Sequence, residues 1–135
     1  MLTPELKQLR DTVRETSFSI HRYLRNGHLD KVYQNALVHR LCKQGLRIQP
    51  KHPLNVYDED GTLLGEFFAD LFVEDRLIVE LKACKAMADE HVVQLLGYLR
   101  ASRIEDGLLI NFGAQKLQIR KYVLSQEEEQ LYGQN

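Results

Sequence analysis

The sequence predicts an α/β domain in which helices pack on a central mixed β-sheet. Three observations predict this class. Two helical stretches open the chain, apolar and alternating stretches fill the middle, and another long helical stretch separates these strands from two more near the end. The predicted order is α-α-β-β-β-α-β-β. The 135 residues suit a single domain spanning 1–135, in which residues 126–135 form a polar tail that frays.

The first predicted helix begins at residues 3–5, where a capping threonine, a first-turn proline and an acidic residue follow one another. It runs to about Arg25, where the Asn-Gly pair at 26–27 stops it. The second helix begins near Asp30, which could cap it, and ends at Gly45.

The strands are predicted from runs of alternating or continuous apolar residues bounded by turn signals. They span residues 47–57, 63–73, 76–83, 108–112 and 117–124, with a third long helix over 88–102. Pro50 and Pro53 favour an edge position for the first strand, because proline cannot donate to a β-ladder.

Composition and charge limit the function classes. Apolar residues make up 44% of the chain and charged residues 27%, an ordinary globular balance. The formal net charge of -1 excludes a strongly basic coat, so nucleic acid would have to bind a local patch. Two cysteines are too few for a metal cage made of cysteine alone. The start of the chain lacks the apolar core of a signal peptide, and no apolar run reaches the roughly 20 residues of a membrane span. We therefore expect a cytoplasmic protein with no membrane partner.

The informative segment is the pair of apolar strands that contain Asp70, Glu80 and Lys82. A carboxylate inside an apolar strand is costly unless it is paired, hydrogen-bonded or bound to a metal. Because side chains alternate along a strand, Glu80 and Lys82 share one face. The bland alternative is an ordinary salt bridge between Glu80 and Lys82 or Arg76.

The length of the hairpin loop decides whether the two acids meet. If Glu74 and Asp75 alone form the loop, Asp70 and Glu80 lie on opposite faces. If the loop has three residues, Glu74 to Arg76, Asp70 is directly opposite Glu80, and both carboxylates can hold one ion. With the backbone carbonyl of Leu81 and waters, they would form an oxygen site suited to Mg²⁺ or Mn²⁺. Lys82 would then supply positive charge where negative charge develops.

These residues resemble the PD-(D/E)XK, or restriction-endonuclease-like, nuclease superfamily. Gln94-Leu95-Leu96-Gly97-Tyr98 in the third helix is similar to the QxxxY motif of its RecB-like branch. More closely, residues 16–122 resemble the small bacterial GxxExxY family. The matching pieces are GHLDKVY at 27–33, ADLFVEDRLIVELKA at 69–83, QLLGYLRAS at 94–102 and GLLINFG at 107–113.

The resemblance implies a restriction-endonuclease-like core and a function for each matching residue. It implies Asp70 and Glu80 as metal ligands, Lys82 as the catalytic lysine, and Gln94 and Tyr98 as further residues of the catalytic site. Asp30 stands where the family has a glutamate. The resemblance implies that the acidic residue at this position adds to the metal site, directly or through water. The aspartate side chain is one carbon shorter, which favours the contact through water.

We therefore expect a Mg²⁺- or Mn²⁺-dependent nuclease that hydrolyses phosphodiester bonds, with DNA favoured over RNA. The sequence contains no evident module for reading a base sequence, so specificity would come from a homodimer or a partner protein. Two alternatives stay open: a nuclease fold retained as a binding or scaffolding module, and a phosphohydrolase acting on small nucleotides.

Overall fold

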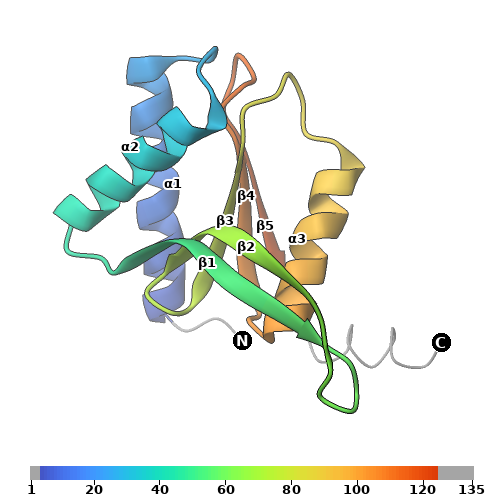
Figure 1. The fold of residues 1–135 in the computed structure, drawn as a ribbon. Coiled ribbons are helices and arrows are strands. Elements are labelled where there is room, and N and C mark those ends of the chain that lie inside the picture. Colours follow the sequence, from blue (N-terminus) through green and yellow to red (C-terminus); the bar gives the residue numbers. More distant parts are fainter. Residues whose placement is uncertain (1–3, 125–135) are drawn as a thin grey trace.

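The predicted α/β class and element order are confirmed by a computed structural model, which describes residues 4–124 (Figure 1). The predicted tail at 126–135 lies outside the described residues. The elements are α1 (Pro4–Leu24), α2 (Asp30–Lys43), β1 (Ile48–Tyr57), β2 (Leu63–Val73), β3 (Leu77–Lys82), α3 (Asp89–Ser102), β4 (Asp106–Asn111) and β5 (Gln118–Val123). Within residues 4–124, no helix is both long and apolar enough to cross a bilayer.

The five strands form one mixed sheet in the order β1-β2-β3-β4-β5. Strands β1, β2 and β3 form an antiparallel meander, β4 lies parallel to β3, and β5 returns antiparallel to β4. A parallel pair needs a crossover connection, and α3 supplies it between β3 and β4. The first strand is an edge, as its two prolines predicted.

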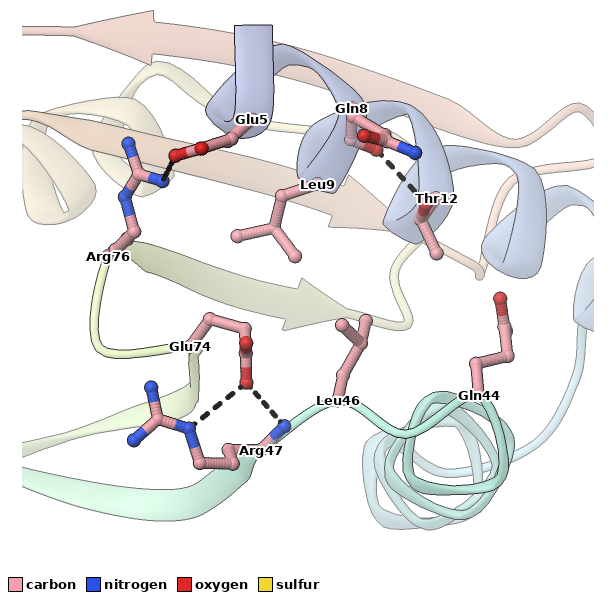
Figure 2. A pocket seen from close by; sticks show the side chains of 9 residues that line it. All are labelled: Glu5, Gln8, Leu9, Thr12, Gln44, Leu46, Arg47, Glu74 and Arg76. Carbon is pink, nitrogen blue, oxygen red and sulfur yellow. Dashed lines mark hydrogen bonds and ion pairs between the residues drawn. The ribbon is translucent and has the colours of Figure 1, made fainter. Parts of the chain in front are cut away.

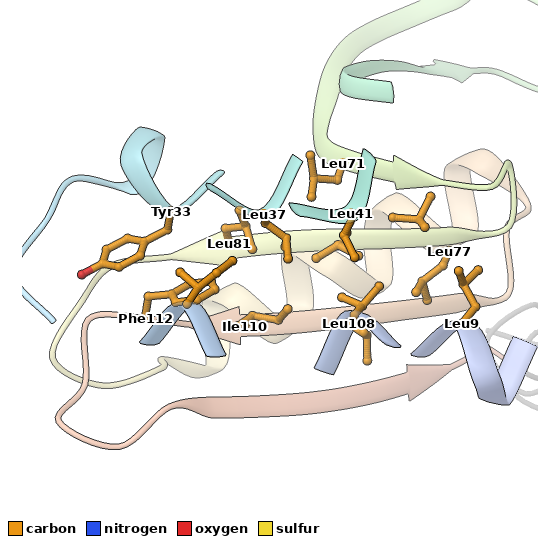
Figure 3. Packing of buried hydrophobic residues seen from close by; sticks show 14 of the residues in the cluster. Leu9, Tyr33, Leu37, Leu41, Leu71, Leu77, Leu81, Leu108, Ile110 and Phe112 are labelled. Atoms are coloured by element: carbon orange, nitrogen blue, oxygen red, sulfur yellow. The ribbon is translucent and has the colours of Figure 1, made fainter. Parts of the chain in front are cut away.

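Helices cover both faces of the sheet (Figure 1). On the face of α1 and α2, the odd-numbered residues of β3 (Leu77, Val79 and Leu81) pack with Leu37 and Leu41 (Figure 3). On the face of α3, a smaller cluster holds side chains from β2, β3, β4 and α3, among them Phe72, Ile78, Leu95, Leu99 and Leu109. The even-numbered side chains of β3 therefore face α3.

The start of α2 differs from the prediction. Leu29, not Asp30, is the N-cap residue, and no side chain caps this helix end. The preceding loop is fixed instead by Tyr33, which is fully buried and stacks on Phe112 at a centroid distance of 4.7 Å. The Tyr33 hydroxyl donates to the Arg25 carbonyl at 2.6 Å. Asp30 is exposed and does not cap the helix.

A buried ion pair joins the first helix to the start of β4. Arg10 lies 3.1 Å from Asp106, and both side chains are less than a tenth exposed. Burial raises the pKa of the Asp106 carboxyl even though the Arg10 charge lowers it. Asp106 begins β4 opposite Leu77, two residues before the predicted strand start. The pair fixes α1 at the end of the sheet where β3 also begins.

The segment that follows Lys82 is held by the end of β4. The buried Asn111 side chain accepts from the Cys84 N–H at 3.1 Å and donates to the Cys84 carbonyl at 2.9 Å. The Phe112 N–H donates to the Lys82 carbonyl at 2.8 Å. A Cβ atom at Gly113 would overlap backbone atoms of Ala83 and Cys84. Glycine at 113 therefore permits the contact that fixes the chain just after Lys82.

We predict that Gly113→Ala lowers the free energy of unfolding by about 3 kcal/mol, because the backbone must move to admit the methyl group. Gly65→Ala in β2 is the matched control, since no heavy atom of the described residues lies within 4 Å of a Cβ there, and it should change stability by less than about 0.5 kcal/mol. Urea denaturation of the three proteins measures both values. Equal stabilities for Gly113→Ala and the parent would contradict this packing.

Candidate active site

The hairpin between β2 and β3 has the three-residue connection that brings the acidic residues together. Val73 pairs with Leu77, and the register continues through Leu71 opposite Val79. Glu74 and Asp75 both adopt positive φ angles, 52° and 55°, where glycine is more usual. Continued by one residue, the same register puts Asp70 opposite Glu80. The three-residue alternative is thereby confirmed and the two-residue alternative is wrong.

Beyond the Leu71–Val79 pair, the side chains of Asp70 and Glu80 accept the hydrogen bonds that link β2 to β3. The Asp70 N–H donates to Glu80 Oε1 at 3.0 Å, and the Leu81 N–H donates to Asp70 Oδ2 at 2.7 Å. The two carboxyl groups are also hydrogen-bonded to each other. Both side chains lie on the α3 face, because Asp70 alternates with Phe72 and Glu80 with Ile78. The pair thus forms one compact group of carboxyl oxygens.

Burial and mutual repulsion keep a proton on this pair. Glu80 is only 5% exposed, and burial followed by the charge of Asp70 raises its pKa to about 8. Burial also raises the pKa of the Asp70 carboxyl, although the Leu81 N–H opposes that shift. Two carboxyl groups this close cannot easily both ionise, so they share one proton near neutral pH.

No basic side chain pairs with either acid within residues 4–124. Arg76 lies 3.6 Å from Glu5, at the other end of the hairpin. Lys82 lowers the pKa of both acids through its charge but forms no ion pair with them within 4.0 Å. The alternative of a structural salt bridge from Glu80 to Lys82 or Arg76 is therefore wrong. A pair of acids with raised pKa values in a largely apolar setting marks a candidate functional site.

Lys82 presents its side chain on the face of the pair, whereas Leu81 presents its backbone groups to the pair. Lys82 is half-buried at the end of β3, on the same face as Glu80. Leu81 points its side chain into the core on the opposite face, while its N–H points toward β2. In a β-strand the N–H and C=O of one residue point to the same side. The Leu81 carbonyl therefore also points toward β2 and Asp70.

The second turn of α2 contributes Gln34, which the sequence reasoning missed. Its Nε2 donates to the Asp70 carbonyl at 3.2 Å. Asp30 lies one turn earlier on the same helix, and its negative charge raises the pKa of Asp70. The i, i+4 spacing of Asp30 and Gln34 was the available signal, since residues four apart share a helix face. Among residues 4–124, Asp30 is related to the pair through its charge, with no hydrogen bond between them.

Helix α3 brings Tyr98 to the site and leaves Gln94 at its border. The charges of Glu80 and Asp70, after burial, raise the pKa of the Tyr98 hydroxyl. Gln94 lies one turn earlier, is exposed, and lines the same surface pocket as Tyr98. Within the described part of the chain, no hydrogen bond joins Gln94 to the acidic pair. His91 has a different function, because its Nδ1 accepts from the Ala88 N–H at 3.1 Å at the start of α3.

A separate pocket of about 490 Å³ lies between α1, the end of α2 and the hairpin turn (Figure 2). Its charges are paired with one another: Arg47 lies 3.3 Å from Glu74, and Arg76 lies 3.6 Å from Glu5. Neither Asp70 nor Glu80 lines it. These ion pairs connect the hairpin turn to the start of β1 and to α1. We therefore interpret the pocket as part of the packing of the fold.

The donor set fits a hard divalent cation. Two carboxyl groups and a strand carbonyl supply oxygen atoms, the ligands that Mg²⁺ and Mn²⁺ prefer. Among residues 4–124, no three His, Cys, Asp or Glu side chains converge on one point. That composition argues against a zinc-type cage and suits an ion that keeps several waters.

A mixed sheet with helices on both faces and an Asp…Glu-x-Lys hairpin defines a nuclease-type core. The family model described as the PD-(D/E)XK nuclease superfamily matches residues 7–122, and the chain belongs to that superfamily. No curated protein and no solved structure matches the chain.

The shared proton predicts a pH dependence of stability in the metal-free protein. Burial and the charge of Asp70 raise the pKa of Glu80 from 4.5 to about 8 in the folded protein. Between these values the native state holds a proton that the unfolded chain has released, so the free energy of unfolding falls as pH rises. The slope cannot exceed about 1.4 kcal/mol per pH unit for one group.

Glu80→Gln keeps an acceptor oxygen for the Asp70 N–H and removes the titration. We expect a flatter profile for this variant and a higher free energy of unfolding than the parent at about pH 8. Denaturant melts in a chelator across about pH 5 to 8 measure it, with the exposed Glu66→Gln of β2 as control. A less stable Glu80→Gln at about pH 8 would show that Glu80 is ionised and well paired.

Proposed function

We propose that the protein is a divalent-metal-dependent nuclease that hydrolyses phosphodiester bonds, and that it belongs to the GxxExxY subfamily. The observation that carries the proposal is the Asp70–Glu80 carboxyl pair, in which Glu80 is buried, Asp70 is partly buried and both pKa values are raised, with no ion-pair partner among residues 4–124. Membership of a nuclease superfamily supports the reaction class. Mg²⁺ is the proposed ion, with Mn²⁺ as a substitute.

Asp70, Glu80 and the Leu81 carbonyl would hold the metal, and Asp30 would reach it through water. The Asp30 carboxylate is exposed and acts on Asp70 through its charge, which suits a contact with the metal through water. When bound, such an ion polarises a phosphate oxygen and lowers the pKa of a coordinated water. To hold the ion, Asp70 and Glu80 would both have to be deprotonated, because metal ligands must be deprotonated.

Three side chains around the pair, those of Lys82, Gln34 and Tyr98, have separate proposed functions. Lys82, on the same strand face as Glu80, would neutralise charge that develops on the phosphate. Gln34 positions Asp70 through its backbone carbonyl and does not touch the reacting atoms. Tyr98 would donate a hydrogen bond from its hydroxyl, whose raised pKa keeps it protonated.

The substrate is proposed to be nucleic acid, with DNA favoured over RNA. The net charge of -1 supplies little general attraction for phosphates. Selection of a cleavage site would therefore come from a second copy of the chain or from a partner protein.

A catalytically weak binding module is the second candidate. Asp30 in place of the family's glutamate and the net charge of -1 favour it. This candidate predicts nucleic-acid binding without metal-dependent cleavage.

Cleavage of single- and double-stranded DNA and RNA in Mn²⁺ tests the proposal. We expect metal-dependent hydrolysis that Lys82→Ala reduces about 100-fold or more, since it removes charge at the reacting phosphate. Lys85→Ala is the matched control: Lys85 is exposed, lies three residues later, and should leave the rate within about twofold. Absence of cleavage of every substrate, or equal rates for both variants, would reject the nuclease proposal.

A further inference from the structure

A groove of about 680 Å³ lies next to the candidate site, between β1, β2 and the exposed side of α3. Phe67 and Tyr98 form its aromatic wall, with ring centroids 4.4 Å apart and planes inclined by 35°. Gln94, Gly97 and Ala101 line it from α3. The volume lies within the range of pockets that hold small planar ligands.

Tyr98 connects the groove to the acidic pair. Its ring forms part of the groove wall, while the charges of Glu80 and Asp70 act on its hydroxyl. Tyr98 is therefore the side chain that the groove and the surroundings of the acidic pair have in common. The described residues that line the groove include no carboxylate. This suits a neutral aromatic ring as the ligand.

We propose that this groove binds an unpaired nucleobase of a single-stranded nucleic acid, next to the bond to be cleaved. The proposal rests on the nuclease function above and specifies its substrate class. A base would stack on the wall formed by Phe67 and Tyr98, as bases do on aromatic side chains in single-strand binding proteins. The exposed Gln94 amide offers both a donor and an acceptor to a base edge. A base-paired strand presents no free face to such a wall.

Gly97 makes the proposal testable without disturbing the core. No heavy atom of the described residues lies within 4 Å of a Cβ built there, so the fold tolerates a side chain at this position. Because Gly97 lines the groove, a leucine would occupy the space that a base needs, whereas an alanine adds one methyl group. Both substitutions favour the helix over glycine.

The experiment measures binding of short oligonucleotides that carry one fluorescent adenine analogue, in a chelator so that no strand is cut. The parent should quench the analogue in single strands and bind duplexes at least about tenfold more weakly. Gly97→Leu should weaken single-strand binding about tenfold or more, matching the loss of one stacked base, while Gly97→Ala stays within about twofold of the parent. DNA and RNA versions of the probe determine which sugar is accepted. Thermal melts check that both variants are folded.

Three outcomes would overturn the proposal: equal binding by Gly97→Leu and the parent, equal affinity for duplex and single strands, or a change of oligomeric state with Gly97→Leu while oligonucleotide binding is unaffected. The last result would assign the groove to self-association. The nuclease proposal fails separately, through absent cleavage in Mn²⁺. Groove-dependent binding without cleavage would leave the base site intact and remove only the catalytic function.

Discussion

The contact between the Asp70 and Glu80 carboxyl groups is the interaction on which the site depends. It exists because the β2–β3 connection has three residues, which puts both side chains on the α3 face of the sheet. The two acids then complete each other's hydrogen bonds across the strands. Without a cation they must share a proton, since both are largely removed from water. The close approach of the two carboxyl groups in this hairpin therefore also determines their protonation state.

The rest of the fold holds that hairpin in place from several directions. At the turn, Arg47 binds Glu74, and at the strand end Asn111 fixes the chain after Lys82. Gln34 reaches Asp70 from α2, and α3 covers the opposite face and presents Tyr98. Contacts from α2, α3 and β4 therefore converge on the β2–β3 hairpin and on the segment that follows it. Such support keeps the two carboxyl groups in one geometry, as a binding or catalytic site requires.

The fold was predictable because apolar periodicity and turn residues agreed along most of the chain. The site was predictable only in part. The composition of residues 74–76 could not decide the loop length, because Glu74 and Asp75 adopt positive φ angles without a glycine to indicate it. Gln34 was missed because its contact is to a backbone carbonyl far away in sequence. Asp30 looked like a helix cap, but Leu29 occupies that position. Long-range contacts of this kind leave no local pattern in a single sequence.

The central claim is that Asp70 and Glu80 form a cation site that holds a proton when no cation is bound. Calorimetric titration with Mg²⁺ or Mn²⁺ near neutral pH, repeated in buffers of different ionisation enthalpy, counts protons released on binding. The account predicts binding with release of about one proton per ion, because metal ligands must be deprotonated, and loss of both signals in Asp70→Asn. Absence of metal binding, or binding without proton release that Asp70→Asn leaves unchanged, would contradict it.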